Sequence, residues 1–146
     1  MRVLGIDLGA KRIGVALSDV TGTLASPLVV LNRSGDRAGD HRALAALVRE
    51  HDATLVVVGL PLSLSGEAGP AARGALEEVA ELQAALGVPV ETLDERFTTV
   101  SAHQALAAQG RGRRDRRALI DKAAAAVLLQ AWLDRARLRE TAPGDA

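Results

Sequence analysis

The sequence predicts a single α/β domain built on a mixed five-stranded sheet. The chain has 146 residues, close to the commonest size of one domain. Three short β-type runs joined by turns open the chain, and helical and strand patterns alternate after them. Because short turns join antiparallel strands and helical crossovers join parallel ones, we expect three antiparallel leading strands and two parallel later strands, flanked by helices.

The three leading strands are expected at Arg2–Leu8, Arg12–Ser18 and Leu24–Leu31. The short glycine-containing segment Gly9–Lys11 between the first two is typical of a hairpin. Pro27 cannot donate a hydrogen bond to a neighbouring strand. The third strand is therefore expected at an edge of the sheet or at a bulge.

Turn-forming residues occupy Ser34–Asp40, and a helix is expected directly after them at Arg42–Glu50. Within that range Leu44, Leu47 and Val48 recur at helical spacing. This spacing predicts a helix with one apolar face.

The middle of the chain adds two strands and a second helix. Thr54–Val58 is apolar and β-branched without interruption, which predicts a strand covered on both faces. A loop rich in Ser, Gly and Pro follows at Leu60–Gly69. Pro70 is well placed to begin the next helix and Gly87 to end it. The last strand is expected at Val88–Leu93.

The remaining chain is predicted to be mainly helical. We expect a short helix at Thr98–Gln109, a basic loop at Gly110–Arg117 and a long alanine-rich helix at Ala118–Arg139. The domain is expected to span residues 1–140, with 141–146 as a polar tail.

Composition excludes several classes of site. No cysteine is present, so a disulfide framework, a thiolate zinc site and a cysteine nucleophile are ruled out. One tryptophan, one phenylalanine and no tyrosine argue against an aromatic platform for single-stranded bases. Eighteen basic and eighteen acidic residues cancel, so only local charge can indicate a nucleic-acid partner. No membrane-length apolar run or secretory layout is visible, and we expect a cytoplasmic protein without a membrane partner.

Asp7 is the first candidate functional residue. It ends the run Val3–Ile6 inside a predicted strand, where a buried charge is costly unless it is paired or bound to a metal. The alternative is a turn-capping aspartate just before Gly9. The strand position favours a functional carboxylate.

Two further acids, Asp94 and Glu95, follow the last predicted strand at its carboxyl end. In open α/β sheets ligands bind at that edge. Asp94 is interpreted as a solvated residue or as the cap of the next helix, a role that Thr98 could also fill. For Glu95 the spacing alone leaves a solvated residue and a site residue equally open.

Asp121 is the third candidate. Ala124, Ala125 and Leu128 follow it at helical spacing, which places it on the face expected to pack inward. The alternative is an acid that stabilises the helix dipole in the first turn. A carboxylate on a packing face favours function.

Three acids from separate segments form an oxygen-only ligand set, which suits Mg²⁺ or Mn²⁺ better than zinc. Such ions are the usual means of phosphodiester hydrolysis. The three histidines, His41, His51 and His103, are scattered and are interpreted as surface residues.

A cluster of five arginines with one aspartate, Asp115, directly precedes the helix that carries Asp121. A basic loop beside a metal site suits a phosphate backbone, although a solvated charge run is the usual alternative. The cluster comprises Arg111, Arg113, Arg114, Arg116 and Arg117.

Four segments together resemble the YqgF/RuvX family from Met1 to about Arg135. They read GIDLGAKRIGVALSD, VVVGLPLSLSGEAG, DERFTTVSA and IDKAAAAVLLQAWLD. The resemblance implies a ribonuclease H-like fold. Proteins of this bacterial family are described as Holliday junction resolvases or as nucleases that mature the small-subunit ribosomal RNA precursor.

The family's three acidic positions fall on Asp7, Glu95 and Asp121, which implies that these residues are catalytic and bind Mg²⁺ or Mn²⁺. The implied partner is structured RNA or branched DNA, and a homodimer is left open. Relatives often carry lysines before the third acid, where this chain has forked arginine donors. The expected nucleic-acid-binding residues are Lys11, Arg12, Arg96, Arg111, Arg113, Arg114, Arg116 and Arg117.

Two other functions are compatible with parts of the sequence. GIDLG also resembles the first phosphate loop of actin-like ATPases and sugar kinases, but those proteins need two such domains and no second phosphate motif is seen. A non-catalytic RNA-binding factor for ribosome assembly could use the same basic surface. Dependence of turnover on Asp7 would separate that factor from a nuclease, and RNA and DNA substrates stay open.

Overall fold

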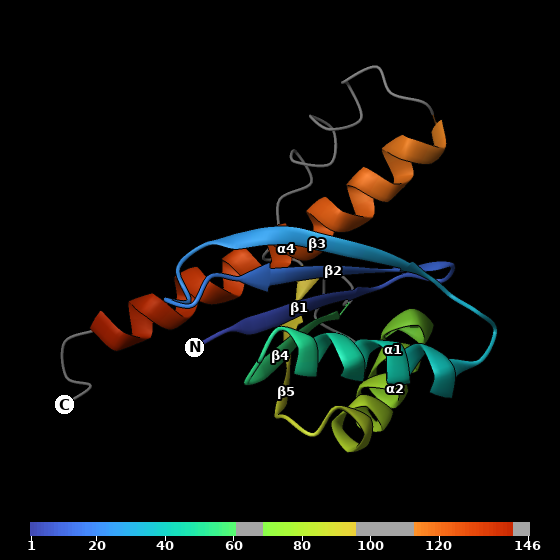
Figure 1. The fold of residues 1–146 in the computed structure, drawn as a ribbon, viewed down its shortest axis with the longest axis horizontal. Coiled ribbons are helices and arrows are strands. Elements are labelled where there is room, and N and C mark those ends of the chain that lie inside the picture. The colour runs from blue at the N-terminus through green and yellow to red at the C-terminus, as the bar shows by residue number, and fades with distance from the viewer. Residues whose placement is uncertain (61–68, 96–112, 142–146) are drawn as a thin grey trace.

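The computed structural model describes residues 1–60, 69–95 and 113–141, with the backbone alone for 71, 113–122, 140 and 141 (Figure 1). These residues form five strands and three helices. In chain order they are β1 (Val3–Leu8), β2 (Arg12–Ser18), β3 (Ala25–Asn32), α1 (Arg37–Glu50), β4 (Leu55–Leu60), α2 (Pro70–Leu86), β5 (Val90–Asp94) and α4 (Arg113–Thr141).

The five strands form one mixed sheet in the order β3-β2-β1-β4-β5. β1, β2 and β3 pair antiparallel, β4 runs parallel to β1, and β5 runs parallel to β4. The predicted sheet is therefore confirmed. β1, β4 and β5 all point the same way, so their carboxyl ends meet at one edge of the sheet.

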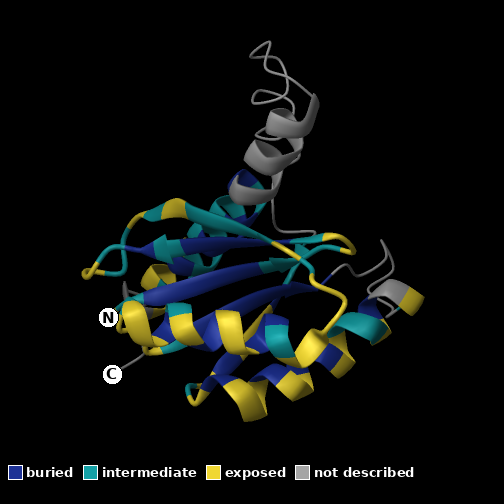
Figure 2. Cartoon of the chain, turned by 45° about the vertical axis from the view of Figure 1, so that its right-hand side comes forward, coloured by how far each residue is buried: buried dark blue, intermediate teal, exposed yellow. Residues whose placement is uncertain are grey.

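Helices cover both faces of the sheet: α1 and α2 lie on one face and α4 on the other (Figure 1). Alternating residues of β1 supply both cores. Leu4 and Ile6 pack in the cluster with α1 and α2, whereas Val3 packs in the cluster with α4. The central strands are accordingly buried, while the outer sides of α1 and α2 are exposed (Figure 2). Val56, Val57 and Val58 of β4 have no exposed surface, as the continuous apolar run predicts.

β3 is an edge strand, as Pro27 predicts. Pro27 lies opposite Ala16, directly after a register shift between Val15 and Ala16. The irregularity accommodates a residue that lacks a backbone N–H.

The ends of α2 follow the sequence signals. Pro70 is the first helical residue, and Gly87 ends the helix in the left-handed conformation with φ 72°. A glycine adopts this backbone conformation without the steric cost that a Cβ would add.

α1 begins at Arg37, five residues earlier than the predicted Arg42. The turn predicted at Ser34–Asp40 is therefore wrong for its last four residues. Asp40 lies in the first helical turn, where an acid is favourable, and its Oδ1 accepts hydrogen bonds from the backbone N–H and hydroxyl of Ser34. This contact ties the preceding turn to the helix.

α4 begins at Arg113, so the predicted basic loop at Gly110–Arg117 is wrong from that residue onward. The four arginines from Arg113 to Arg117 lie in the first two turns of this helix, in keeping with the high helix propensity of arginine. The first turns of α4 project beyond the sheet (Figure 1). The predicted helix at Thr98–Gln109 and residues 61–68 and 142–146 lie outside the described residues.

Four strands differ slightly from their predicted limits: β1 and β3 each begin one residue later than predicted, and the largest differences are in β4 and β5. β4 continues to Leu60, and β5 begins at Val90, two residues after the predicted Val88. Pro89 has no N–H to donate, but its carbonyl accepts a hydrogen bond from the N–H of Val56. Within the described ranges, no helix is long and apolar enough to cross a membrane.

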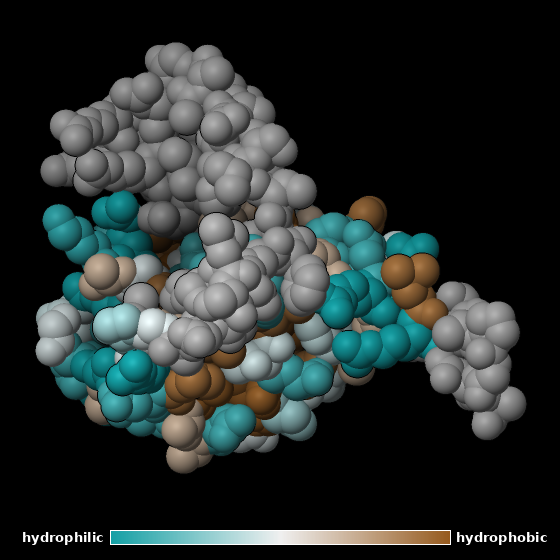
Figure 3. All heavy atoms as spheres, turned by 180° about the vertical axis from the view of Figure 1, so that it is seen from behind, coloured by the Kyte–Doolittle hydropathy of each residue, from teal (hydrophilic) through white to brown (hydrophobic). Residues whose placement is uncertain are grey.

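The surface seen from behind is largely hydrophilic where it is coloured, with apolar residues gathered in smaller areas (Figure 3). Large apolar side chains with high exposure lie at dispersed positions of the sequence. They are Met1, Val20, Leu24, Leu76 and Leu138.

Candidate active site

Asp7 lies on β1, opposite Gly14 of β2, one residue before the strand ends. Side chains alternate along a strand, so Asp7 shares a face with Val3 and Gly5. Val3 packs with α4, and a Cβ at position 5 would lie only 2.8 Å from Cβ of Leu129 on α4. Asp7 therefore faces the α4 side of the sheet, near its carboxyl edge.

Glu95 directly follows β5, whose last residue, Asp94, lies opposite Leu60 at the end of β4. Its side chain is hydrogen-bonded to that of Asp7. The sheet thus brings together two of the three predicted acids from distant parts of the sequence. They meet at the edge where parallel strands end, which is the usual place for ligands in such sheets.

Gly59 makes room for this pair. A Cβ at position 59 would lie 3.0 Å from Oε1 of Glu95 and would overlap Cδ1 of Leu128 on α4. The missing side chain lets α4 approach β4 and lets Glu95 lie over the strand. Sequence analysis missed Gly59, although a glycine inside a buried strand is a known signal of close approach.

The electrostatics of the pair favour a bound proton or cation. Burial, the charge of Asp7, the hydrogen bond between the two side chains and the charge of Asp94 together raise the pKa of Glu95 to about 7. Two neighbouring carboxylates repel each other when both are ionised. A divalent cation would remove this repulsion by taking the place of the shared proton. The donor set, made of carboxylate oxygens, fits Mg²⁺ or Mn²⁺.

The raised pKa of Glu95 predicts how stability depends on pH without metal. Between its ordinary value of 4.5 and about 7 the folded state binds more protons than the unfolded state, so the free energy of unfolding should fall as pH rises. Glu95→Gln should therefore melt at a higher temperature than the wild type at pH 8, with the difference vanishing near pH 4.5. Thermal melts in chelator at both pH values measure this.

The matched control is Glu91→Gln, which makes the same change on an exposed residue of β5. It should leave the pH dependence of the melting temperature as in the wild type. A Glu95→Gln melting curve that follows the wild type at every pH would show that Glu95 carries no raised pKa.

Asp121 belongs to α4, four residues before Ala125 and seven before Leu128, both of which are buried. Its side chain lies outside the described part of the structure. Because α4 begins at Arg113, Asp121 is not in the first turn, which removes the basis of the helix-dipole alternative. No group of three metal-ligating side chains occurs among the residues whose side chains are described, and Asp121 is not one of them.

The predicted nucleic-acid-binding residues are only partly described. Lys11 is exposed and Arg12 half-buried at the turn that follows β1, at the same edge as Asp7. Arg96 and Arg111 lie outside the described residues. The remaining four arginines are placed by their backbone alone, in the first turns of α4.

His41 is buried, so its interpretation as a surface residue is wrong. Its Nε2 lies 2.8 Å from Oε2 of the buried Glu78 on α2. Position 41 precedes Leu44 and Val48 at helical spacing, and this signal could have placed it on the inner face of α1. His51 is half-buried, and His103 lies outside the described residues.

Glu78 also anchors the turn beside Asp7. Nη1 and Nη2 of Arg33 donate to its carboxylate, at 2.8 and 2.9 Å, and Nε of Arg33 donates to the carbonyl of Gly9 at 2.8 Å. Burial opposes the charge of Glu78, but hydrogen bonds from Arg33 and His41 outweigh it and lower the pKa. Arg33 thus ties the β1–β2 turn to α2.

Comparison with known proteins extends this picture. A family profile described as "RuvX: Holliday junction resolvase" matches residues 1–135. A protein of Anaeromyxobacter dehalogenans, provisionally named a pre-16S rRNA nuclease, is 47% identical over 92% of this chain and 98% of its own length. A protein of Mycobacterium ulcerans with the same provisional name is 49% identical over 93% of this chain and 80% of its own length.

Solved structures show the same fold. Thermus thermophilus RuvC is 22% identical with a TM-score of 0.56, covering 94% of this chain and 96% of that one. RuvC of the same organism in complex with a Holliday junction substrate is 24% identical with a TM-score of 0.55, covering 100% and 98%.

The sheet order, the helices on its two faces and these matches define a nuclease with a ribonuclease H-like fold, a hydrolase of phosphodiester bonds. The family profile spans nearly all of the sequence, and close relatives cover more than nine-tenths of it. The chain belongs to the RuvX family.

Proposed function

We propose that this protein is a metal-dependent nuclease that processes the precursor of small-subunit ribosomal RNA, with Asp7, Glu95 and Asp121 as catalytic metal ligands. The observation that carries the proposal is the hydrogen-bonded Asp7–Glu95 pair at the carboxyl edge of the sheet. The names of relatives at 47% and 49% identity support the RNA substrate. The family description supports branched DNA as the second candidate.

Each acid has a distinct supporting element. Asp7 lies on the central strand β1, and Glu95 follows β5. Asp121 lies on α4, on the stripe that continues into Ala125 and Leu128. Bound Mg²⁺ or Mn²⁺ would supply an activated water and stabilise the leaving oxygen. The carboxylates would give up their shared proton on binding, and Gly59 keeps Glu95 close to Asp7.

Substrate recognition should rest on the backbone and shape of the nucleic acid. Tyrosine is absent and only two aromatic residues, Trp132 and Phe97, occur in the sequence. Lys11 and Arg12 extend from the turn beside Asp7 and would meet phosphates. Action on a ribosomal RNA precursor implies a cytoplasmic protein, and a homodimer remains a prediction for sedimentation analysis.

The proposal is tested by offering the purified protein two substrates in Mg²⁺ or Mn²⁺: a transcript of the ribosomal RNA precursor and a synthetic four-way DNA junction. Site-specific cleavage of the transcript supports RNA processing, and cleavage of the junction alone supports a resolvase. Binding to the transcript without cleavage in either metal would favour the non-catalytic assembly factor.

The arginines of α4 should set affinity more than chemistry. Changing Arg113, Arg114, Arg116 and Arg117 to alanine should weaken binding to every sequence alike. Each lost phosphate contact should lower the slope of log affinity against log salt by roughly 0.7 on single strands or 0.9 on duplex DNA. Removing positive charge from the start of a helix should not destabilise it. Binding titrations at several salt concentrations, with thermal melts, measure both effects.

The control removes the arginines at the other end of α4, Arg135, Arg137 and Arg139. Their loss should leave the salt slope unchanged. An unchanged slope in the quadruple variant would mean that the substrate approaches Asp121 from another side.

A further inference from the structure

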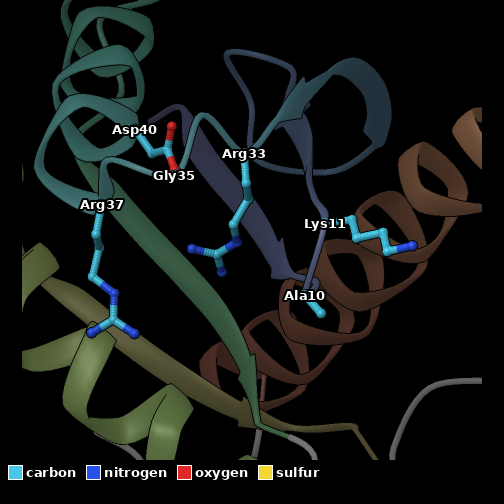
Figure 4. Close-up of a pocket in the computed structure, with 6 residues that line it drawn as sticks. All are labelled: Ala10, Lys11, Arg33, Gly35, Arg37 and Asp40. Carbon is cyan, nitrogen blue, oxygen red and sulfur yellow. The ribbon is translucent and has the colours of Figure 1, made fainter.

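A second site lies beside the turn that follows Asp7. It is a pocket of about 410 Å³ at the same edge of the sheet (Figure 4). The β1–β2 turn, the segment between β3 and α1, and the first turn of α1 form its walls. The lining residues are Ala10, Lys11, Arg33, Gly35, Arg37 and Asp40.

Asp40 lines this pocket and carries an unsatisfied acceptor. The residue is 7% exposed, and its Oδ1 accepts hydrogen bonds from the hydroxyl and the N–H of Ser34 at 2.8 and 3.2 Å. Its Oδ2 is buried and accepts no hydrogen bond from any described residue. A buried carboxylate oxygen without a donor is costly, so a donor supplied by a ligand would be favourable.

The cations around the pocket restrict what that ligand can be. Arg33 is held by Glu78 and Gly9, whereas the side chain of Arg37 is 46% exposed and reaches Glu81 at 3.2 Å. Lys11 is exposed at the rim, with its ammonium pointing away from Arg33 (Figure 4). The positive charge of these side chains disfavours a metal ion as the ligand and favours an anion. The ligand must also carry a hydrogen-bond donor for Asp40.

A ribonucleotide combines both features. Its 2′-hydroxyl is a single donor, which matches the one unsatisfied oxygen of Asp40, and its phosphates suit the exposed cations. A guanine edge would need both carboxylate oxygens, but Oδ1 is already engaged by Ser34. Because Oδ2 is buried, the residues around it must shift as the ribose enters.

We infer that this pocket binds one ribonucleotide of the substrate strand, with its 2′-hydroxyl donating to Oδ2 of Asp40 and its phosphate lying near Arg37 and Lys11. The inference rests on the proposed nuclease function. The strand would cross the turn Gly9–Lys11 between this pocket and Asp7. The pocket would thereby distinguish RNA from DNA near the cleavage site.

The test compares an RNA hairpin carrying a single-stranded tail with the same molecule in 2′-fluoro form, which keeps the sugar pucker but has no hydroxyl proton. Binding is measured by fluorescence anisotropy in Ca²⁺, and a gel checks that the RNA stays intact. The wild type should bind RNA about tenfold more tightly, as expected for one hydrogen bond to a charged group. Equal affinities in the wild type would overturn the inference whatever the variants do.

Asp40→Asn should reduce this ratio to below about threefold, because it keeps an oxygen for Ser34 and removes the charged acceptor. The control Asp36→Asn removes the same charge from an exposed residue at the start of α1 and should keep the wild-type ratio. If a folded Asp40→Asn variant keeps the wild-type ratio of RNA affinity to 2′-fluoro affinity, the 2′-hydroxyl is recognised elsewhere. If the protein cleaves the RNA precursor but binds both hairpins equally, the pocket inference fails and the nuclease proposal stands. If it neither cleaves nor binds RNA, both the nuclease proposal and the pocket inference are rejected.

Discussion

Asp7→Asn, Glu95→Gln and Asp121→Asn are each expected to reduce cleavage by about a hundredfold or more while the protein stays folded. Each change removes a proposed metal ligand with little change in volume. Metal ions typically contribute several kcal/mol to stabilising charge in the transition state, and about 3 kcal/mol corresponds to about a hundredfold in rate. Single-turnover cleavage with each variant measures the effect.

Asp94→Asn is the informative comparison for Glu95→Gln. Asp94 lies next to Glu95 and its charge contributes to the raised pKa of Glu95, but it is not a proposed ligand. Its replacement should change the rate far less than loss of a ligand. Near-normal cleavage by any one of the three isosteric variants would remove that residue from the catalytic site.

The second large effect concerns the metal ion. Mg²⁺ or Mn²⁺ should support cleavage, and excess chelator should abolish it. Ca²⁺ should allow binding with little or no turnover, because its longer and more irregular coordination places the attacking water poorly. Cleavage assays and binding titrations in the three ions, on the same preparation, measure the two properties separately.

Adding Mg²⁺ back after chelation should restore the rate, which controls for irreversible damage. The first turns of α4 are not proposed to hold the ion, so the arginine variant should need the same metals as the wild type. Strong cleavage in excess chelator would refute the metal mechanism.

The sheet was predictable because its signals are local. Three local features restrict where individual strands lie in the sheet. They are the continuous apolar run at β4, the short glycine-containing turn before β2, and Pro27 on β3. Asp7 and Glu95 could be singled out for the same reason, since each is an acid at the end of an apolar run. Their meeting follows from the parallel course of β1, β4 and β5.

The helix starts were not predictable from apolar spacing. α1 and α4 both begin with polar turns that carry no apolar periodicity, at Arg37 and Arg113. Such turns are helical because arginine favours helices and because Asp40 joins Ser34 to the first turn of α1.

Buried polar contacts between distant elements were also missed. His41 and Glu78 are polar residues on inner helix faces that contact each other, and Glu78 also accepts hydrogen bonds from Arg33. A sequence shows such residues singly, without their partners. Gly59 likewise has its role only through Glu95 and Leu128, which come from other elements.

Calorimetric titration of Mn²⁺ at pH 7, in buffers of different ionisation enthalpy, most directly tests whether Asp7 and Glu95 hold the ion together. Because the pKa of Glu95 is about 7, roughly half of the protein molecules carry a proton on this side chain at pH 7. Binding of Mn²⁺ should therefore release roughly half a proton per ion at pH 7 and less at pH 8.5. Glu95→Gln should weaken binding and abolish the release. Binding to the wild type without proton release, and with unchanged affinity in Glu95→Gln, would contradict a metal site at this pair.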